Sequence, residues 1–338
     1  MTAACIFGCT GPVLTDAEQA FFREVRPFGF ILFRRNVETP DQVRRLVSAL
    51  RATVDDDAAP VMIDQEGGRV QRLGPPHWPV YPPGRIYGAL KTDDPVMAQA
   101  FARLGARLMA ADLVSLGINV DAVPVLDVPQ PGAHDVIGDR AYGATPEKVA
   151  RLGRAAAEGL LAGGVLPIIK HIPGHGRSTA DSHLDLPVVT ADKEALSSVD
   201  FAPFRNLSDM PMAMTAHVIY TALDPKRPAT TSRKVIRDTI RKDIGFSGLL
   251  MSDDLSMKAL KGDFAERTRR SLKAGCDIVL HCNGDMAEMT AIADVTPKLS
   301  GKAKLRAAAA MARIPKSPEP LDAAGERARF AELVKSAT

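Results

Sequence analysis

A short segment in the middle of the chain concentrates side chains that can do chemistry. Residues 170–183 read Lys-His-Ile-Pro-Gly-His-Gly-Arg-Ser-Thr-Ala-Asp-Ser-His and directly follow the apolar run 165–169. Burying such groups without partners costs free energy, whereas loops at strand ends are where rigid scaffolds display reactive side chains. The segment is therefore predicted to form part of an active site.

Two hypotheses use this segment alone. The histidines and the aspartate suit a zinc-dependent hydrolase, although their spacing matches no closed zinc template such as HExxH. Lys170 could instead form a Schiff base, which requires a lowered pKa for its amine. Nearby Asp64 and Asp253 would favour the charged ammonium, so we interpret Lys170 as a hydrogen-bond donor to a polar ligand.

The elements that must position these groups recur along the whole chain. Eight short apolar runs are predicted as strands buried on both faces, which is typical of a parallel sheet. They are Ala3–Gly8, Phe28–Phe33, Pro60–Gln65, Ile118–Val125, Leu166–Lys170, Met212–Val218, Gly248–Asp253 and Cys276–His281. Helix-start signals lie between them, for example Thr39 with Pro40 and Thr145 with Pro146.

This alternation predicts the α/β class and a (β/α)8 TIM-type barrel, with an open doubly wound sheet as the rival architecture. We expect residues 1–315 to form the barrel as a single domain. Residues 316–338 are expected to form a helical or partly disordered tail, because they are charged and rich in alanine.

Polar side chains gather at the carboxyl ends of the predicted strands, where barrel enzymes build their sites. They are Asp64–Arg69 and Arg72, then Asp135, Asp139 and Arg140, then Lys170 and His171, His217, Asp253 and Asp254, and His281. Asp253 is interpreted as a chemical group. Asp254 is open to an alternative role as a helix cap, and His217 and His281 to structural roles. Glycoside hydrolysis needs a carboxylate, an acid/base and hydrogen-bonding groups for hydroxyls, and this inventory fits that chemistry best.

Composition narrows the class of protein. The chain has 338 residues, is 46% hydrophobic and carries a formal net charge of +3, which is too small to suggest nucleic acid as the main partner. The four cysteines form no zinc template, and no apolar run approaches the length of a membrane span. The N-terminal residues do not resemble a signal peptide. We expect a cytoplasmic enzyme without metal or other cofactor and without a membrane or nucleic-acid partner.

Several motifs, in order over roughly residues 5–290, resemble those of glycoside hydrolase family 3. They are Asp64–Arg72, Val136–Arg140, Lys170–Gly176, 179–183, Pro211–Tyr220 and Ser252–Met257. Within that family the chain is most similar to the single-domain bacterial β-N-acetylhexosaminidases of the NagZ type. It has no counterpart of the extra sandwich domain found in larger relatives.

The resemblance implies a role for each matching residue. It makes Asp253 the nucleophile, His183 the acid/base and Asp181 the group that orients His183. It assigns sugar binding to Asp64, Arg72, Arg140, Lys170 and His171.

The resemblance also implies an exo-acting, retaining enzyme that removes terminal N-acetylglucosamine from peptidoglycan fragments such as GlcNAc-anhydroMurNAc-peptides. A saccharide or muropeptide is then the substrate, and a monomer is expected. A glycosyl phosphorylase or a β-glucosidase of the same family remains an alternative, as does a sugar-binding protein without turnover.

Overall fold

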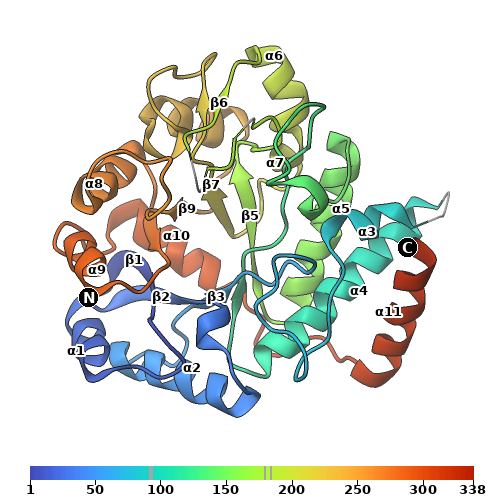
Figure 1. Cartoon of the computed structure of the whole chain (residues 1–338), viewed down its shortest axis with the longest axis horizontal. Helices are drawn as coiled ribbons and strands as arrows, with labels where there is room; N and C mark the ends of the chain where they lie inside the picture. The colour runs from blue at the N-terminus through green and yellow to red at the C-terminus, as the bar shows by residue number, and fades with distance from the viewer. Residues whose placement is uncertain (91–93, 179, 183–184) are drawn as a thin grey trace.

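Eight parallel strands close into a barrel in the computed structural model, which describes residues 1–90, 94–178, 180–182 and 185–338 (Figure 1). Around the barrel the strand order is β1-β10-β9-β7-β5-β4-β3-β2. The strands are β1 (Ala3–Gly8), β2 (Pro27–Leu32), β3 (Val61–Ile63), β4 (Val120–Asp121), β5 (Leu166–Ile172), β7 (Met212–Thr215), β9 (Leu249–Asp254) and β10 (Ile278–His281). The predicted barrel is confirmed, and the doubly wound alternative is wrong.

Helices surround this barrel, and α2 and α5 begin at the predicted signals Thr39 with Pro40 and Thr145 with Pro146. The α-helices are α1 (Asp16–Val25), α2 (Pro40–Val54), α3 (Gly84–Ala89), α4 (Pro95–Val114), α5 (Pro146–Ala162), α6 (Lys193–Ala195), α7 (Ala202–Asn206), α8 (Phe264–Ala274), α9 (Met286–Ala293), α10 (Gly301–Met311) and α11 (Ala323–Ala337). Shorter 3-10 segments are η1 (Arg34–Asn36), η2 (Gly138–Arg140) and η4 (Ala229–Thr231), and π-helical ones are η3 (Leu196–Asp200) and η5 (Val235–Asp243). The Thr15, Thr39 and Thr145 side chains accept hydrogen bonds from backbone amides at their helix starts.

Four strands are shorter than predicted: Met212–Val218 and Cys276–His281 lose two or three residues to become β7 and β10, and the two largest reductions are at β3 and β4. The runs Pro60–Gln65 and Ile118–Val125 shrink to β3 and β4. The Gln65 amide donates to the Asp121 side chain of β4, at 3.0 Å from Oδ1, instead of to a backbone carbonyl. Pro124 has no amide hydrogen to donate. The chain therefore leaves regular pairing early here and turns toward the carboxyl end of the barrel.

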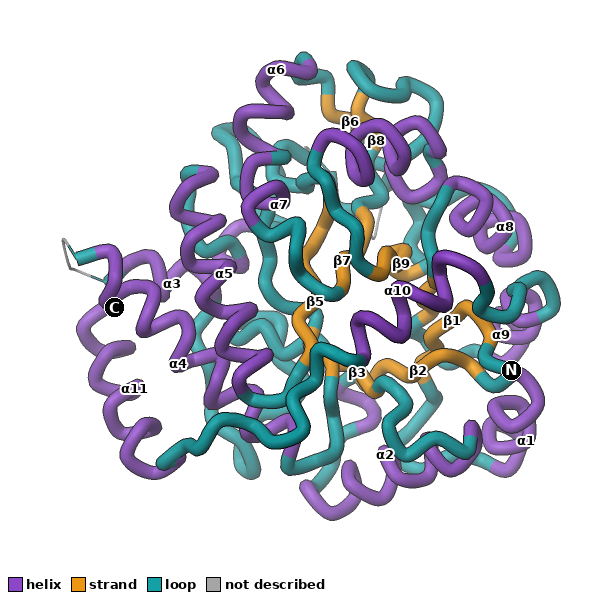
Figure 2. Tube along the Cα trace, turned by 180° about the vertical axis from the view of Figure 1, so that it is seen from behind, coloured by secondary structure: helices purple, strands orange, loops and turns teal. Residues whose placement is uncertain are grey.

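The interior of the barrel is a packed apolar core with one end covered by α10. Met62, Ile168 and Met212 from three strands belong to the same buried cluster as Ala307 and Ala310 of α10. Figure 2 shows α10 lying across this end of the strands. Polar groups that point out of the barrel therefore collect at the opposite, carboxyl end of the strands.

The C-terminal helix α11 packs against the outside of α4. The Phe330 ring lies 5.3 Å from Phe101 and 6.0 Å from Tyr81 between centroids, and Arg327 forms an ion pair with Asp112. The division into a barrel of residues 1–315 and a tail of residues 316–338 stays a prediction. Within the described ranges, no helix combines the length and the apolar character needed to cross a membrane.

Candidate active site

A cavity of about 370 Å³ lies at the carboxyl end of the barrel. Its lining comes from the ends of β2, β3, β5, β7, β9 and β10, from loops that follow them, and from the loop after β4. Six of the predicted site residues line it, namely Asp64, Arg72, Arg140, Lys170, His171 and Asp253. The fold therefore brings together groups from four well-separated segments of the sequence into one cavity.

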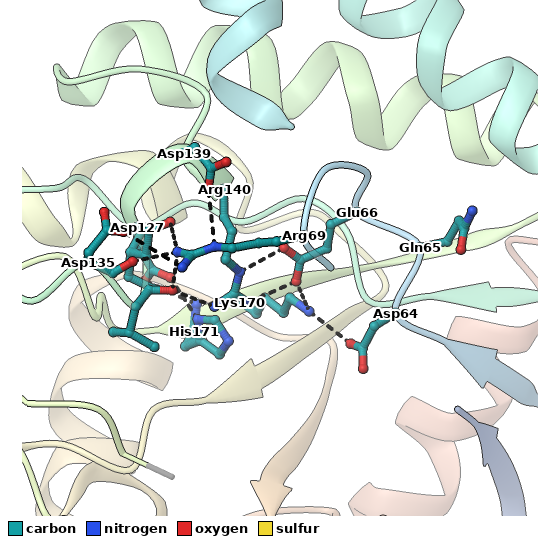
Figure 3. Close-up of polar contacts among 12 residues, drawn as sticks. Asp64, Gln65, Glu66, Arg69, Asp127, Asp135, Asp139, Arg140, Lys170 and His171 are labelled. Atoms are coloured by element: carbon teal, nitrogen blue, oxygen red, sulfur yellow. Dashed lines mark hydrogen bonds and ion pairs between the residues drawn. The ribbon is translucent and has the colours of Figure 1, made fainter. Parts of the chain in front are cut away.

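Ion pairs connect five of the residues on one side of this cavity, which we call the ion-pair network: Asp64, Glu66, Arg72, Arg140 and Lys170. Figure 3 shows four of them, Asp64, Glu66, Arg140 and Lys170. Lys170 Nζ donates to Asp64 Oδ1 at 3.0 Å and lies 2.6 Å from Glu66 Oε1. Arg140 donates through Nε and a terminal nitrogen to both oxygens of Glu66, each at 2.8 Å. Arg72 donates to Asp64 Oδ2 at 3.1 Å. Three cations thus hold two carboxylates in fixed orientations.

The network fixes the charge of its members at neutral pH. Burial alone would raise the pKa of Glu66, but the Arg140 and Lys170 charges outweigh it and hold that pKa at about 2. In the same way, Lys170 and Arg72 hold the pKa of Asp64 well below its usual range. Burial would lower the pKa of Lys170, but Asp64 and Glu66 raise it above its ordinary value. Lys170 is therefore an ammonium donor, and the Schiff-base hypothesis has no support here.

Arg69 holds the loop that delivers Arg140. Its guanidinium lies 3.1 Å from Asp139 Oδ1 and 3.8 Å from Asp135 Oδ2, and it also donates to the Val136 carbonyl at 3.0 Å (Figure 3). Asp135 and Asp139 do not line the cavity. Asp135 and Asp139 therefore shape the loop through Arg69. Of the three charged residues predicted at this strand end, only Arg140 reaches the cavity.

Asp127 is a buried carboxylate that the sequence analysis missed. Its Oδ2 lies 2.7 Å from His171 Nδ1, and its Oδ1 accepts from the backbone amides of His171 at 3.2 Å and His175 at 2.7 Å. This pairing fixes one ring nitrogen of His171 and leaves the imidazole as part of the cavity wall. Asp127 sits in the apolar run 122–128, which gives no signal for a polar role.

Two adjacent aspartates end β9, and they have different surroundings. Asp254 accepts hydrogen bonds from the Ser256 amide at 3.0 Å and the Cys282 amide at 3.2 Å, and also from the Ser256 hydroxyl. The Asp254 amide in turn donates to Asp253 Oδ1 at 2.8 Å. Asp254 therefore organises the backbone around the strand end, close to the capping role considered from the sequence. Both carboxylates line the cavity.

The two remaining strand-end histidines do not line the cavity. His217 is bonded on both ring nitrogens, to Thr230 Oγ1 at 2.7 Å and to the Asp254 carbonyl at 3.0 Å. His281 is completely buried, and its Nε2 lies 3.3 Å from Glu288 Oε2. Their surroundings agree with the structural alternative.

The loop after β5 lies against the backbone of the segment that follows β4. A Cβ added at Gly176 would lie 2.0 Å from the Val128 carbonyl oxygen, so only glycine permits this approach. Further along, His175 Nε2 lies 3.2 Å from Ser182 Oγ, and both residues line the cavity. Asp181 is not among the lining residues. His183, the predicted acid/base, lies outside the described residues.

Burial, together with the neighbouring His171 imidazole, lowers the pKa of His175 to about 4. His175 is therefore neutral near pH 7. Among the described residues, no three histidine, cysteine, aspartate or glutamate side chains are grouped so that they could hold a metal ion.

A family model and individual relatives place this chain in the same protein family. Residues 15–316 match the glycosyl hydrolase family 3 N-terminal domain. A β-hexosaminidase of Alkalilimnicola ehrlichii is 39% identical over 282 residues, which cover 82% of this chain and 80% of the relative.

Solved structures agree with this family. Native NagZ of Neisseria gonorrhoeae superposes with a TM-score of 0.85 and 32% identity, covering 100% of this chain and 98% of the other. The same protein in complex with N-trifluoroacetyl-D-glucosamine gives a TM-score of 0.80 at 32% identity over the same coverage. The chain belongs to glycosyl hydrolase family 3.

Proposed function

We propose that this β-N-acetylhexosaminidase is exo-acting and retaining, and that it removes terminal β-linked N-acetylglucosamine from peptidoglycan fragments such as GlcNAc-anhydroMurNAc-peptides. Asp253 is the nucleophile that forms a covalent glycosyl-enzyme. His183 is the acid/base, and Asp181 orients its imidazole. We further propose that the enzyme works in the cytoplasm, as its resemblance to the NagZ type implies.

The ion-pair network supports a role in holding one sugar ring. Hydroxyl groups both donate and accept hydrogen bonds, so a site that binds them needs carboxylate oxygens beside cationic N–H groups. Asp64, Arg72 and Lys170 offer this combination on a shared cavity wall. Because these groups are already fixed by one another, little reorganisation is needed when a sugar binds.

The position of Asp253 supports attack on a sugar held by that network. Asp253 lines the cavity from the end of β9, while Asp64 and Lys170 line it from β3 and β5. A retaining glycosidase needs a carboxylate that reaches the anomeric carbon, and a second group that protonates the departing oxygen. Asp253 has the chemistry and the location for the first of these tasks.

Histidine suits the second task near neutral pH. Its unperturbed pKa of about 6.5 allows it to give up a proton in the first step and to accept one from water in the second. An aspartate bonded to the other ring nitrogen selects one tautomer and stabilises the imidazolium. These roles come to His183 and Asp181 by their match to the family motif at 179–183.

The observation that carries the proposal is that Asp253 lines the same cavity as the ion-pair network. A slowly hydrolysed fluorinated N-acetylglucosaminide should accumulate as a covalent adduct, and peptide mapping by mass spectrometry should find the sugar on Asp253. A label on another residue, while turnover of nitrophenyl β-N-acetylglucosaminide proceeds, would contradict the assignment. Product analysis with added inorganic phosphate distinguishes hydrolysis, which releases free sugar, from phosphorolysis.

A further inference from the structure

A second cavity, of about 560 Å³, opens beside the active site between α8 and the segment that contains η4. We call it the basic groove. Its lining includes seven cationic side chains, Lys226, Arg227, Arg233, Lys261, Arg267, Arg270 and Lys273. No aspartate or glutamate is among the lining residues that the structure describes. The groove therefore concentrates positive charge in a concave surface.

Few of these cations form ion pairs within the protein. Arg270 forms an ion pair with Glu266, and Arg267 donates to the backbone carbonyls of Leu255 and Gly262. The other five cations form no ion pair with any carboxylate in the described part of the chain. Protein surfaces usually intersperse charges of both signs, and a concave patch of one sign raises the local concentration of counter-ions.

The basic groove and the active-site cavity share a wall. The Ala259 amide donates to the Ser182 carbonyl at 3.3 Å, and the Leu260 amide donates to the Met257 carbonyl at 3.2 Å. Ser182 and Met257 line the active-site cavity, whereas Ala259 and Leu260 line the groove. The wall is thus built from the loop after β9 and the loop after β5. A ligand that extends out of the active site on this side passes directly over it.

We propose that the basic groove binds carboxylate groups on the leaving-group part of the substrate, and so selects anionic peptide-bearing saccharides over neutral ones. This proposal rests on the proposed function, which supplies a leaving group with a peptide that carries several carboxylates. The sugar to be cleaved occupies the active-site cavity, and the peptide crosses the wall at 257–260 into the groove. The cations then recognise charge rather than one peptide sequence, because six of the seven side chains are exposed to solvent.

The test compares three substrates on the wild type and on the triple variant Lys226→Gln/Arg227→Gln/Arg233→Gln. The substrates are nitrophenyl β-N-acetylglucosaminide, a GlcNAc-anhydroMurNAc-tripeptide, and the same tripeptide with its carboxylates amidated. Because exposed charge pairs are individually weak and three are removed together, we expect roughly a tenfold loss of kcat/KM on the carboxylated tripeptide at low salt. The loss should shrink as salt increases, and the other two substrates should change less than twofold.

A matched variant controls for net charge. Arg45→Gln/Arg151→Gln/Lys302→Gln removes the same charge from exposed positions on α2, α5 and α10. It should behave like the wild type on all three substrates. An equal loss in this control, an equal loss on the amidated tripeptide, or unchanged kcat/KM in the groove variant would each overturn the proposal.

A binding measurement separates this proposal from the proposed function. The free carboxylated tripeptide, without any sugar, should bind the wild type by calorimetry and bind the groove variant several-fold more weakly. If wild-type enzyme fails to hydrolyse any N-acetylglucosaminide, the proposed function falls while this measurement still decides the groove. Tighter binding of a single-stranded oligonucleotide than of the tripeptide would also overturn it.

Discussion

On the β3–β5 side of the active-site cavity, Asp64 and Glu66 are held by side-chain cations, whereas on the β9 side Asp254 is held by backbone amides. The first arrangement fixes full charges and binds polar ligands. In the second, the Ser256 and Cys282 amides orient Asp254, and the Asp254 amide in turn donates to Asp253 Oδ1 at 2.8 Å. The comparison separates a wall of paired charges, which suits hydroxyl groups, from a strand end whose backbone orients the proposed nucleophile.

The largest expected effect is a loss of activity when the proposed nucleophile on the β9 side of the cavity is removed. Asp253→Ala should lower kcat by at least about 10³-fold, because it removes the group that forms the covalent intermediate. The midpoint of urea unfolding should stay within the range of ordinary surface substitutions. Steady-state kinetics with a nitrophenyl substrate and an unfolding titration check both parts. Normal turnover by this variant would remove Asp253 from the nucleophile role.

The second effect concerns the proposed acid. His183→Ala should lower kcat/KM by about 10²–10⁴-fold on substrates with a poor, sugar-like leaving group, which needs protonation. Nitrophenyl glycosides need little protonation and should lose much less in their first step. A series of leaving groups of rising pKa measures the difference. Equal losses across the series would argue against the acid role.

The third effect tests the ion-pair network by stability. Glu66→Ala leaves the buried cations Arg140 and Lys170 without a shared partner, which should cost about 3–5 kcal/mol in the free energy of unfolding. The control is Asp55→Ala, which breaks an ion pair with Arg26 in which the Asp55 side chain is 78% exposed. That exposed pair should be worth under about 1 kcal/mol. Similar losses from both substitutions would show that the network adds nothing to stability.

The fourth effect is a pH dependence of the free energy of unfolding, in which His175 and Glu66 act in different pH ranges. The folded pKa of His175 is lowered to about 4, so between about pH 4 and 6.5 the unfolded chain binds a proton that the folded chain does not. Stability should therefore fall by on the order of 3 kcal/mol as the pH drops through this window. His175→Gln should remove this pH dependence of the free energy of unfolding, as measured by urea unfolding at several pH values.

Glu66 acts in a lower window. Its folded pKa of about 2 is below the unfolded value, so its contribution is complete above about pH 4.3 and is lost as the pH falls toward 2. The same titration on Glu66→Gln should leave the upper window unchanged and flatten the lower one. A slope above pH 4.3 that vanishes in Glu66→Gln would contradict this division.

Much of the fold is predictable because its signals are local. Thr15, Thr39 and Thr145 announce helix starts within three or four residues, and each apolar run reads as a strand without knowledge of its partners. The two-stranded sheet of β6 (Val188–Val189) and β8 (Ile219–Tyr220) escapes such analysis, because two-residue strands carry no periodicity.

The site was only partly predictable because some of its residues act through distant partners. The motif with Asp64 and Arg72 and the strand with Lys170 identified one wall of the cavity. Glu66 was visible in the same motif, but its bonds to Arg140 bridge 74 positions in the chain. Asp127 reaches His171 across 44 positions from within an apolar run, so only three-dimensional contact reveals it.

The helix α10 closes the amino end of the barrel with Ala307 and Ala310. Ligands therefore enter and leave the active-site cavity at the carboxyl end of the strands. The depth of the cavity then sets the order of product release. The leaving group, which lies nearer the opening, dissociates first, and the sugar bound deeper in the cavity dissociates second.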